Sequence, residues 1–350
     1  MMKKNLAVLF GGCSPEYPVS LQSASAVLEY VDRSRYHVLP IGINRHGDWF
    51  HYTGPLEHIA SDTWQNDPSQ CTPIVFSQSR IKRGFFTLTT EGTTFTSVDL
   101  ALPMLHGENG EDGTVQGLLA LADIPVVGCG VLASALCMDK HRAHMLVAQA
   151  GIAVPKGIVL ADGESDIPKR LRYPLFVKPV HAGSSFGISK VSDPSALPDA
   201  LALARRYDKT VLVEEAIDGF EVGCAILGRE TLCVGRVDEI ALQNGFFDFH
   251  EKYHLETAKI HMPARIDAAT EARIQKTAQT IYRVLGCSGF ARVDCFLTPD
   301  GRILFNEVNT IPGMTAHSRF PNMMKGIGLS FSQMLSQLLA LYEEDVPCAH

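Results

Sequence analysis

Apolar residues near the N-terminus occur in two short continuous runs, separated by a segment with helical spacing. The runs at 4–12 (KNLAVLFGG) and 36–43 (YHVLPIGI) are typical of buried strands, and residues 20–31 (SLQSASAVLEYV) between them are predicted to form a helix. A strand, a helix and a second strand in this order form a β-α-β unit, whose two strands are parallel. The chain is therefore predicted to begin with a parallel sheet.

The same alternation continues to about residue 130. Strands are predicted at 98–105 and 124–128, on either side of a helix at 115–123. A long helical stretch at 131–150 follows, and Gly151 is its predicted end. We expect this stretch to link a first α/β domain to the rest of the chain.

After Pro155 the pattern changes to short strands with few helices. The predicted strands contain the segments PLFVKP, ISKV, TVLVEEAI, FEVGCAIL and ETLCVGRVDEI, and one helix interrupts them at about 196–207. Asp267 is the predicted N-cap of a later helix that ends at Gly286, and a last helix is expected at 330–344. This mixture predicts an α+β part after the N-terminal α/β part.

Residues 289–313 are predicted to form a β-hairpin with an unusual polar face. A Pro-Asp-Gly turn near the middle separates the two strands. Because side chains alternate along a strand, Arg292 and Asp294 share one face of the first strand, and Glu307 and Asn309 share one face of the second. A solvated face is the simplest alternative. Oxygen ligands at this spacing are, however, what a divalent cation such as Mg²⁺ requires, with phosphates filling its other positions.

Composition narrows the classes of function. The 350 residues, 46% of them hydrophobic and 20% charged, suggest two or three ordinary globular domains. A net charge of −7 argues against nucleic acid as the main partner. No apolar run approaches the roughly 20 residues of a membrane span, and the stretch at 6–10 is too short for a secretory signal. Nine cysteines without a C-x-x-C pair favour reduced thiols and a cytoplasmic location.

Candidate phosphate binders lie in 178–190. This segment places a Gly-Ser-Ser-x-Gly loop between two predicted strands, where backbone N–H groups and hydroxyls can converge on an anion, although such a turn also occurs without a ligand. Lys178 emerges from a buried strand beside the loop, which favours phosphate. Lys140 is a second candidate, and Glu214 and Glu221 could accept hydrogen bonds from adenine and ribose. A solvated surface position is the alternative for these three.

Neither of the two common phosphate-binding patterns, G-x-x-x-x-G-K-[ST] and G-x-G-x-x-G, occurs in the chain. Seven segments in order nevertheless resemble the ATP-grasp superfamily, and within it the D-alanine–D-alanine ligases: LFGGCSPEYPVS, LHGENGEDGTVQGLL, MDK, VKPVHAGSSFGISK, FDFHEKY, GFARVDCF and NEVNTIPGMTAHS. The resemblance covers nearly the whole chain. It implies a three-domain ATP-grasp architecture: an N-terminal parallel-sheet domain at 1–130, a central lobe at 131–215, and a C-terminal lobe with the metal and catalytic residues at 216–350.

The resemblance also implies a reaction. Such enzymes use ATP to phosphorylate the carboxylate of a first D-alanine, and the amine of a second D-amino acid then attacks the acyl phosphate. Asp294, Glu307 and Asn309 match the family's ligands for two Mg²⁺ ions, for which Mn²⁺ is a possible substitute. Arg292 matches the arginine at the transferred phosphate and the tetrahedral intermediate, assisted by the backbone N–H of Gly313.

Further site residues follow by the same resemblance. The expected ATP-binding residues are Lys140, Lys178, Ser185, Glu214, Ile217, Glu221 and Lys252. The expected catalytic residues besides Arg292 and Gly313 are Glu16, Ser184, Tyr253 and Ser318, where Glu16 holds the first D-alanine and contacts Ser184 and Tyr253 as a loop closes over the site. His106, Ser318 and Arg319 are expected near the second substrate. Without the resemblance, His106 would be interpreted as a core histidine.

The second amino acid is the open question. Ligases that make D-alanyl-D-lactate lack the loop tyrosine, so Tyr253 favours an amine as the nucleophile. Arg319 follows Ser318 where D-alanine–D-alanine ligases usually have an apolar residue, and an arginine there resembles the vancomycin-resistance ligases of the D-alanyl-D-serine branch. We therefore expect a cell-wall precursor ligase that prefers D-serine, with a housekeeping D-alanine–D-alanine ligase as the alternative. A surface ion pair of Arg319 with no effect on this choice also remains possible.

The expected partners follow from the same resemblance. They are ATP, D-alanine, and D-serine or a second D-alanine, with no nucleic acid and no membrane. The resemblance implies a homodimer.

Overall fold

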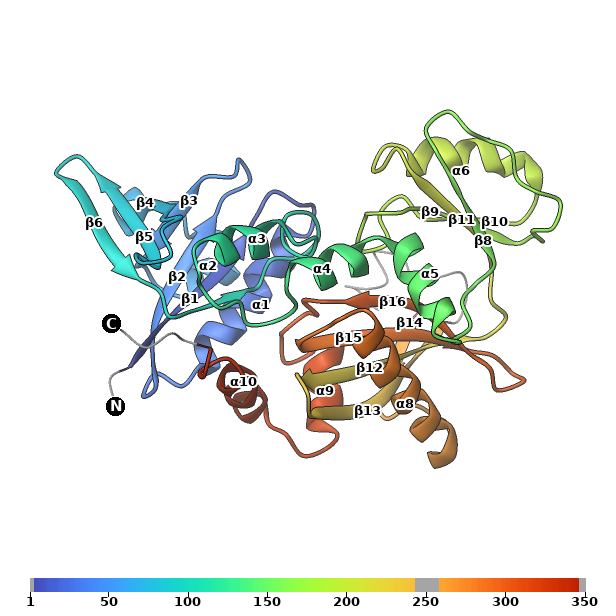
Figure 1. Cartoon of the computed structure of the whole chain (residues 1–350). Helices are drawn as coiled ribbons and strands as arrows, with labels where there is room; N and C mark the ends of the chain where they lie inside the picture. The colour runs from blue at the N-terminus through green and yellow to red at the C-terminus, as the bar shows by residue number, and fades with distance from the viewer. Residues whose placement is uncertain (1–2, 243–257, 346–350) are drawn as a thin grey trace.

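The computed structural model describes residues 3–242 and 258–345, which form three sheets in succession along the chain (Figure 1). The first sheet has seven strands in the order β6-β5-β4-β3-β2-β1-β7. Its strands are β1 (Lys4–Gly11), β2 (Tyr36–Ile43), β3 (Trp49–Tyr52), β4 (Cys71–Phe76), β5 (Gly84–Thr89), β6 (Gly92–Ser97) and β7 (Leu100–Pro103). Three helices accompany them: α1 (Tyr17–Tyr30), α2 (Glu57–Ala60) and α3 (Thr114–Leu121).

The predicted parallel sheet is confirmed at β1, which pairs in parallel with β2 and β7. The strand predicted at 124–128 is wrong, because Val126 makes only a single bridge to Ala101. The N–H of Ile124 donates to Leu119 at the end of α3, and the chain turns at Gly128 with a φ of +131°. The residues between these two points pair with β7 only at this bridge, so they do not form a strand. The antiparallel strands β3–β6 were not predicted.

The predicted helix at 131–150 is two helices, α4 (Val131–Met138) and α5 (Lys140–Gln149). Asp139 between them has an extended backbone, and its side chain accepts a hydrogen bond from the N–H of Arg142. An aspartate that caps the next helix in this way ends the previous one. Lys140 is therefore the first residue of α5.

The second sheet is antiparallel, with the order β10-β9-β11-β8. It consists of β8 (Gly157–Leu160), β9 (Leu175–Pro179), β10 (Ser189–Val191) and β11 (Val211–Glu215), and α6 (Leu197–Ala204) packs on it. A separate hydrophobic core lies between this sheet and α6 and includes Val177, Leu201 and Val213.

The third sheet is also antiparallel, with the order β14-β13-β12-β15-β16. It consists of β12 (Phe220–Gly228), β13 (Leu232–Leu242), β14 (Ala258–His261), β15 (Gly289–Leu297) and β16 (Ile303–Asn309), and its helices are α8 (Ala268–Val284), α9 (Arg319–Lys325) and α10 (Phe331–Ala340). Asp267 caps α8 through the N–H of Thr270, as predicted. The short α9 was not predicted.

The first sheet and the last two helices share one hydrophobic core. Phe10 and Leu21 belong to the same buried cluster as Phe320, Met334 and Leu338. Figure 1 shows α10 beside α1, at the end of the first domain that faces the third sheet. The N-terminal part is thus packed directly against the C-terminal lobe, whereas the central lobe has its own core.

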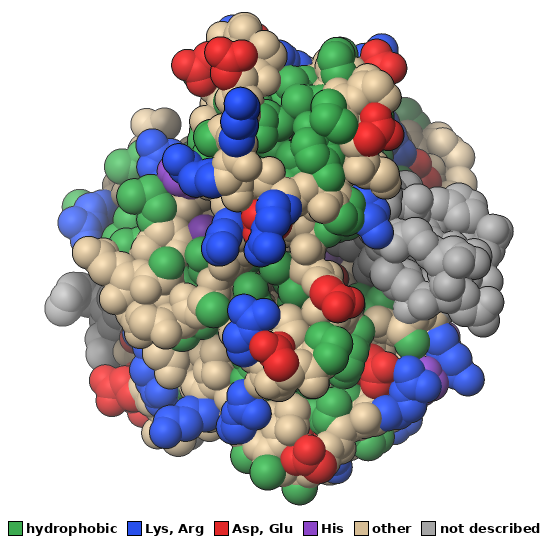
Figure 2. Space-filling view, turned by 90° about the vertical axis from the view of Figure 1, so that its right-hand side faces the viewer, with side chains coloured by type: hydrophobic (Ala, Val, Ile, Leu, Met, Phe, Trp, Pro, Cys, Tyr) green, Lys and Arg blue, Asp and Glu red, His purple; other side chains and the backbone are tan. Residues whose placement is uncertain are grey.

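None of the helices formed by the described residues is long and apolar enough to cross a membrane. On the face shown in Figure 2, Lys and Arg side chains are interspersed with Asp, Glu and neutral side chains.

Candidate active site

The hairpin β15–β16 brings its four polar side chains together as predicted. Arg292 is paired with Asn309, and Asp294 with Glu307, across the two strands. The guanidinium of Arg292 donates to both oxygens of Asp294 at 2.8–3.0 Å, and the Asn309 amide donates to the same carboxylate at 2.9 Å. A cation, an amide and two carboxylates therefore lie at one place on the third sheet.

Arg319 approaches this cluster from α9. Its Nε and Nη2 donate to Asp238 at 2.7 and 2.8 Å, its Nη1 donates to Glu221 at 3.0 Å, and its Nη2 lies 3.4 Å from Asp294. Burial opposes its charge, but Asp238 and Asp294 hold the pKa of Arg319 well above its usual value. The surface ion pair considered from the sequence is wrong, because only 9% of Arg319 is exposed.

The donor set of the hairpin fits Mg²⁺. Asp294, Glu307 and Asn309 supply hard oxygen atoms, and Mg²⁺ usually takes one or two carboxylates, with waters and phosphate oxygens completing its octahedron. Within 3–242 and 258–345, no group of three or more His, Cys, Asp or Glu side chains is arranged to hold a metal on its own.

A cavity of about 280 Å³ opens between the second and third sheets, beside the hairpin. Apolar side chains of Phe176, Ile188, Phe220, Ile240 and Phe296 contribute to its walls. Seven predicted site residues also line it: Lys140, Lys178, Ser185, Glu214, Ile217, Glu221 and Glu307. The structure thus gathers at one cavity six of the seven residues expected at ATP and one of the three expected at the metal, Glu307, whereas Asp294 and Asn309 do not line it.

The lysine and glutamate at the centre of this cavity form a buried pair. Lys178 Nζ lies 2.5 Å from Glu214 Oε1, and both side chains are less than 10% exposed. The other oxygen, Oε2, accepts no hydrogen bond from any described residue. A buried carboxylate oxygen without a donor is costly, so a bound group that brings an N–H would stabilise it. An adenine amine has this chemistry.

Lys140 and the glycine-rich loop approach the cavity from another side. Lys140 is buried, and its Nζ donates to the carbonyl of Ala182 at 2.6 Å. Ser184 and Ser185 in the loop have φ angles of +48° and +59°. Backbone N–H groups next to such left-handed residues can converge on an anion, which is the property expected of a phosphate loop.

Glu16 connects the first domain to this loop. It precedes α1, and its carboxylate accepts a hydrogen bond from the Ser184 hydroxyl, as predicted. Two glycines permit the close approach, because a Cβ at Gly107 or Gly183 would lie 2.3 or 2.8 Å from Glu16 Oε2. Tyr253 and Lys252, the other predicted members of this part of the site, lie outside the described residues.

The predicted second-substrate residues lie around the turn after β16. Ser318 precedes α9 and its Oγ lies 2.8 Å from Thr315 Oγ1, while a Cβ at Gly313 would lie 3.0 Å from Ser318 Oγ. The ring of His106 is buried, with Nε2 3.0 Å from Ser23 Oγ, and burial lowers its pKa to about 4. A neutral, hydrogen-bonded ring is also what a core histidine would have, so its role in substrate binding stays a prediction.

Sequence reasoning missed Glu111, although it lies in a segment that carried the resemblance. Its Oε1 accepts from the N–H of Ile311 at 2.9 Å, and its Oε2 accepts from the N–H of Gly107 at 3.1 Å. Burial and the charge of Glu16 raise the pKa of Glu111 to about 7. The sequence signal that could have revealed Glu111 is its position next to Asp112 in a glycine-rich turn.

The raised pKa of Glu111 predicts a pH effect on stability. The native carboxyl binds its proton more readily than the unfolded one, whose pKa is near 4.5, so its contribution to stability is fully present below pH 4.5 and is lost as the pH rises through 7. As the pH rises, the free energy of unfolding of Glu111→Gln should therefore fall by about 1 to 3 kcal/mol less than that of wild type. Urea unfolding at pH 5 and pH 8 would measure it, with Glu108→Gln, an exposed neighbour, as the control. Equal pH dependence in wild type and Glu111→Gln would contradict the prediction.

Comparison with known proteins identifies the family. The D-ala D-ala ligase N-terminus family matches residues 5–129, and the D-ala D-ala ligase C-terminus family matches residues 146–340. The chain belongs to the D-alanine–D-alanine ligase family. It is therefore an ATP-dependent ligase with the ATP-grasp fold, and this family generally uses Mg²⁺.

Three relatives illustrate the range of this family. The chain is 47% identical over 348 residues to "Vancomycin C-type resistance protein VanC1" of Enterococcus gallinarum, covering 98% of this chain and 99% of that protein. It is 40% identical to a D-alanine–D-alanine ligase of Caldicellulosiruptor bescii, covering 97% and 95%. The solved structure of the VanG D-Ala:D-Ser ligase from Enterococcus faecalis is 58% identical, with a TM-score of 0.91, and the match covers 97% of this chain and all of that one.

Proposed function

We propose that this ligase joins D-alanine to D-serine in preference to a second D-alanine, through a D-alanyl phosphate, and so makes a dipeptide precursor of the cell wall. ATP would occupy the cavity at Lys178 and Glu214, with two Mg²⁺ ions, or Mn²⁺ in their place, at Asp294, Glu307 and Asn309. These ions would neutralise the charge of the transferring phosphate.

A homodimer in the cytoplasm is part of the proposal, and light scattering of the purified protein would test the dimer.

The chain's own residues account for the remaining steps. Glu16 would hold the ammonium group of the first D-alanine, and the carboxylate of that D-alanine would then point toward the nucleotide. Arg292 would stabilise the negative charge that develops on the phosphate and on the tetrahedral intermediate, together with the N–H of Gly313. Closure of the loop that contains Tyr253 would exclude water, because an exposed acyl phosphate hydrolyses before the amine attacks.

The observation that carries the choice of D-serine is Arg319. It follows Ser318 in the predicted second-substrate segment, and it is tied to Asp238, Glu221 and Asp294 behind the catalytic hairpin. A buried polar network at this position, in place of an apolar side chain, favours a second substrate with a hydroxyl group. The similarity to the VanG D-Ala:D-Ser ligase supports the same choice.

A competition experiment tests the proposal. Wild type and Arg319→Leu would each receive ATP, Mg²⁺, D-alanine and an equal concentration of D-serine, and mass spectrometry would resolve the dipeptides. We expect mostly D-alanyl-D-serine from wild type and a loss of this preference in the variant. The product ratio does not depend on how much of the variant is folded. Arg302→Leu, which breaks a solvent-exposed pair with Asp300, is the matched control.

Two other outcomes would contradict parts of the proposal. Mostly D-alanyl-D-alanine from both proteins would favour a housekeeping D-alanine–D-alanine ligase and would give Arg319 no role in the choice. If neither dipeptide forms and no phosphate is released from ATP, the ligase reaction itself would be wrong for this chain.

A further inference from the structure

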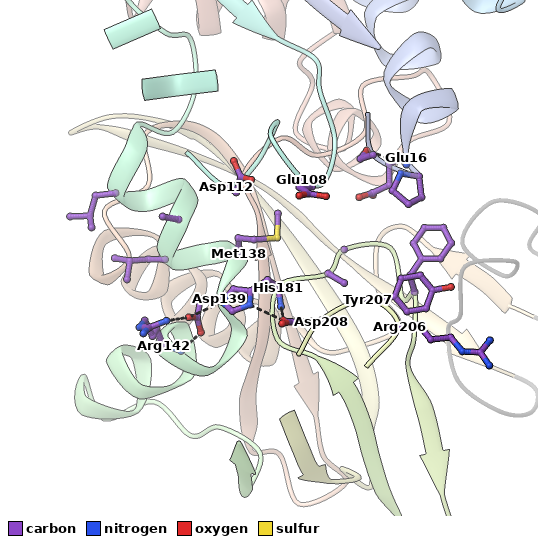
Figure 3. Close-up of a pocket in the computed structure, with 18 residues that line it drawn as sticks. Glu16, Glu108, Asp112, Met138, Asp139, Arg142, His181, Arg206, Tyr207 and Asp208 are labelled. Carbon is purple, nitrogen blue, oxygen red and sulfur yellow. Dashed lines mark hydrogen bonds and ion pairs between the residues drawn. The ribbon is translucent and has the colours of Figure 1, made fainter. Parts of the chain in front are cut away.

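The imidazole of His181 lies between two carboxylates, directly before the glycine-rich loop. Its Nδ1 is 2.7 Å from Asp208 Oδ2, and its Nε2 is 3.2 Å from Asp139 Oδ2 (Figure 3). The backbone N–H of His181 also donates to Asp208 at 2.8 Å. Asp139 is the N-cap of α5, and Asp208 follows α6 in the central lobe. His181 thus connects two elements that are far apart in sequence.

The two contacts require a particular protonation state. An ionised carboxylate only accepts hydrogen bonds, and a neutral imidazole carries a single N–H, so a neutral ring can satisfy only one of the two aspartates. Burial opposes the ionisation of Asp139, but hydrogen bonds from Arg142 and the contact with His181 lower its pKa. Both contacts therefore form together only when His181 is an imidazolium ion.

The loop that follows His181 separates two cavities. The nucleotide cavity lies on one side, lined by Lys140 and Ser185. A second, open cavity of about 720 Å³ lies on the other side and is lined by His181 and both of its aspartate partners (Figure 3). Ala182 lines both cavities and accepts the hydrogen bond of Lys140. A contact that His181 makes in the second cavity can thus fix the position of the loop residues that line the nucleotide cavity.

The loop conformation itself needs such contacts. Ser184 and Ser185 are consecutive non-glycine residues in the left-handed region, a conformation that persists only where the surroundings hold it. The Glu16 carboxylate holds the loop at Ser184, in the middle. The two aspartates hold its beginning at His181.

We propose that His181 is a positioning residue for ATP: as an imidazolium it bridges Asp139 and Asp208, and so it fixes the phosphate loop against the start of α5. This inference rests on the proposed placement of the ATP phosphates at Lys140 and Ser185. Of the charged groups nearby, Arg142 contacts Asp139, and Lys140 contacts the next residue of the loop, Ala182. Arg206, Glu16, Glu108 and Asp112 line the same cavity as His181.

The test compares the KM for ATP and kcat of wild type, His181→Asn and His181→Arg at pH 7. Asparagine cannot bridge both carboxylates. Arginine keeps several donors and a positive charge, and the open cavity has room for it. We expect the KM of His181→Asn to exceed that of wild type about three- to tenfold, since a partly exposed charged contact is of modest strength. The kcat should change less than the KM.

The arginine variant provides the complementary result. Its KM should stay close to that of wild type, because arginine can donate to both aspartates. Calorimetric titration with Mg-ADP should show the same order of affinities. His46→Asn, at an exposed turn of the first domain, is the control.

Two results would overturn the inference. One is a KM of His181→Asn equal to that of wild type, and the other is an arginine variant that behaves like the asparagine variant. Either result would leave the proposed function intact, because wild type would still consume ATP. Absence of ATP consumption by wild type would instead contradict the proposed function.

Discussion

Replacing Arg292 with lysine is expected to lower kcat by about 10²- to 10³-fold, the usual effect of removing one transition-state contact. Arg292 holds Asp294 through three hydrogen bonds of 2.8–3.0 Å. A planar guanidinium can contact this carboxylate and a phosphate oxygen at the same time, whereas an ammonium group is a single point of charge and cannot reproduce that geometry. Steady-state phosphate release with saturating ATP and D-alanine would measure the effect.

The same hairpin offers a matched control. Arg302 pairs with Asp300 at 2.8 Å two residues away, which is the spacing of Arg292 and Asp294, but both of these side chains are more than 60% exposed. Arg302→Lys should leave kcat unchanged. Circular dichroism and Mg-ADP binding would show that Arg292→Lys is folded. A folded Arg292→Lys variant with wild-type kcat would remove Arg292 from the reaction.

The second large effect is expected on stability. Arg319→Leu should lower the free energy of unfolding by about 3–5 kcal/mol, because removing one partner of a buried ion pair leaves the other charge uncompensated. Here Asp238 and Asp294 are each 1% exposed, and Glu221 is the third carboxylate at the same guanidinium. Urea unfolding at pH 7 would measure the loss.

An exposed pair separates burial from charge. Arg302 pairs with Asp300 at 2.8 Å, and both side chains are more than 60% exposed. Arg302→Leu should cost less than about 1 kcal/mol, as for other exposed ion pairs. The double variant Asp238→Asn/Arg319→Leu should recover part of the stability that Arg319→Leu loses. A loss in Arg319→Leu no larger than the small loss in Arg302→Leu would show that the buried network does not stabilise the fold.

The sequence predicted those parts of the fold whose pattern is local. Alternation along 289–313 correctly placed Arg292 opposite Asn309, and Asp294 opposite Glu307. Caps and periodicity located α8 correctly. The break between α4 and α5 was missed because a single capping aspartate follows eight apolar or neutral residues with a helical pattern. The strands of 49–97 were missed because their alternation is weak.

The site residues that were missed obtain their roles from distant contacts. Asp238 meets Arg319 across 81 positions of sequence, and Glu111 meets Ile311 across 200. His181 differs from an ordinary loop histidine only through Asp139 and Asp208, which no pattern in the chain connects to it. Resemblance to a family supplied the residues that are expected to face substrates, and it gave no information about the charged side chains that contact those residues.

The core shared by the first sheet and α10 has a consequence for exchanging segments between relatives. A chimaera that takes residues 1–130 from another ligase of the family would place foreign side chains at Phe10 and Leu21 against the native Phe320, Met334 and Leu338. Native cores tolerate few such mismatches, because they are packed without spare volume. The central lobe, whose core includes Val177 and Val213, is a more self-contained unit. Recombination should therefore succeed more often when the donor supplies both ends of the chain and the recipient supplies the middle.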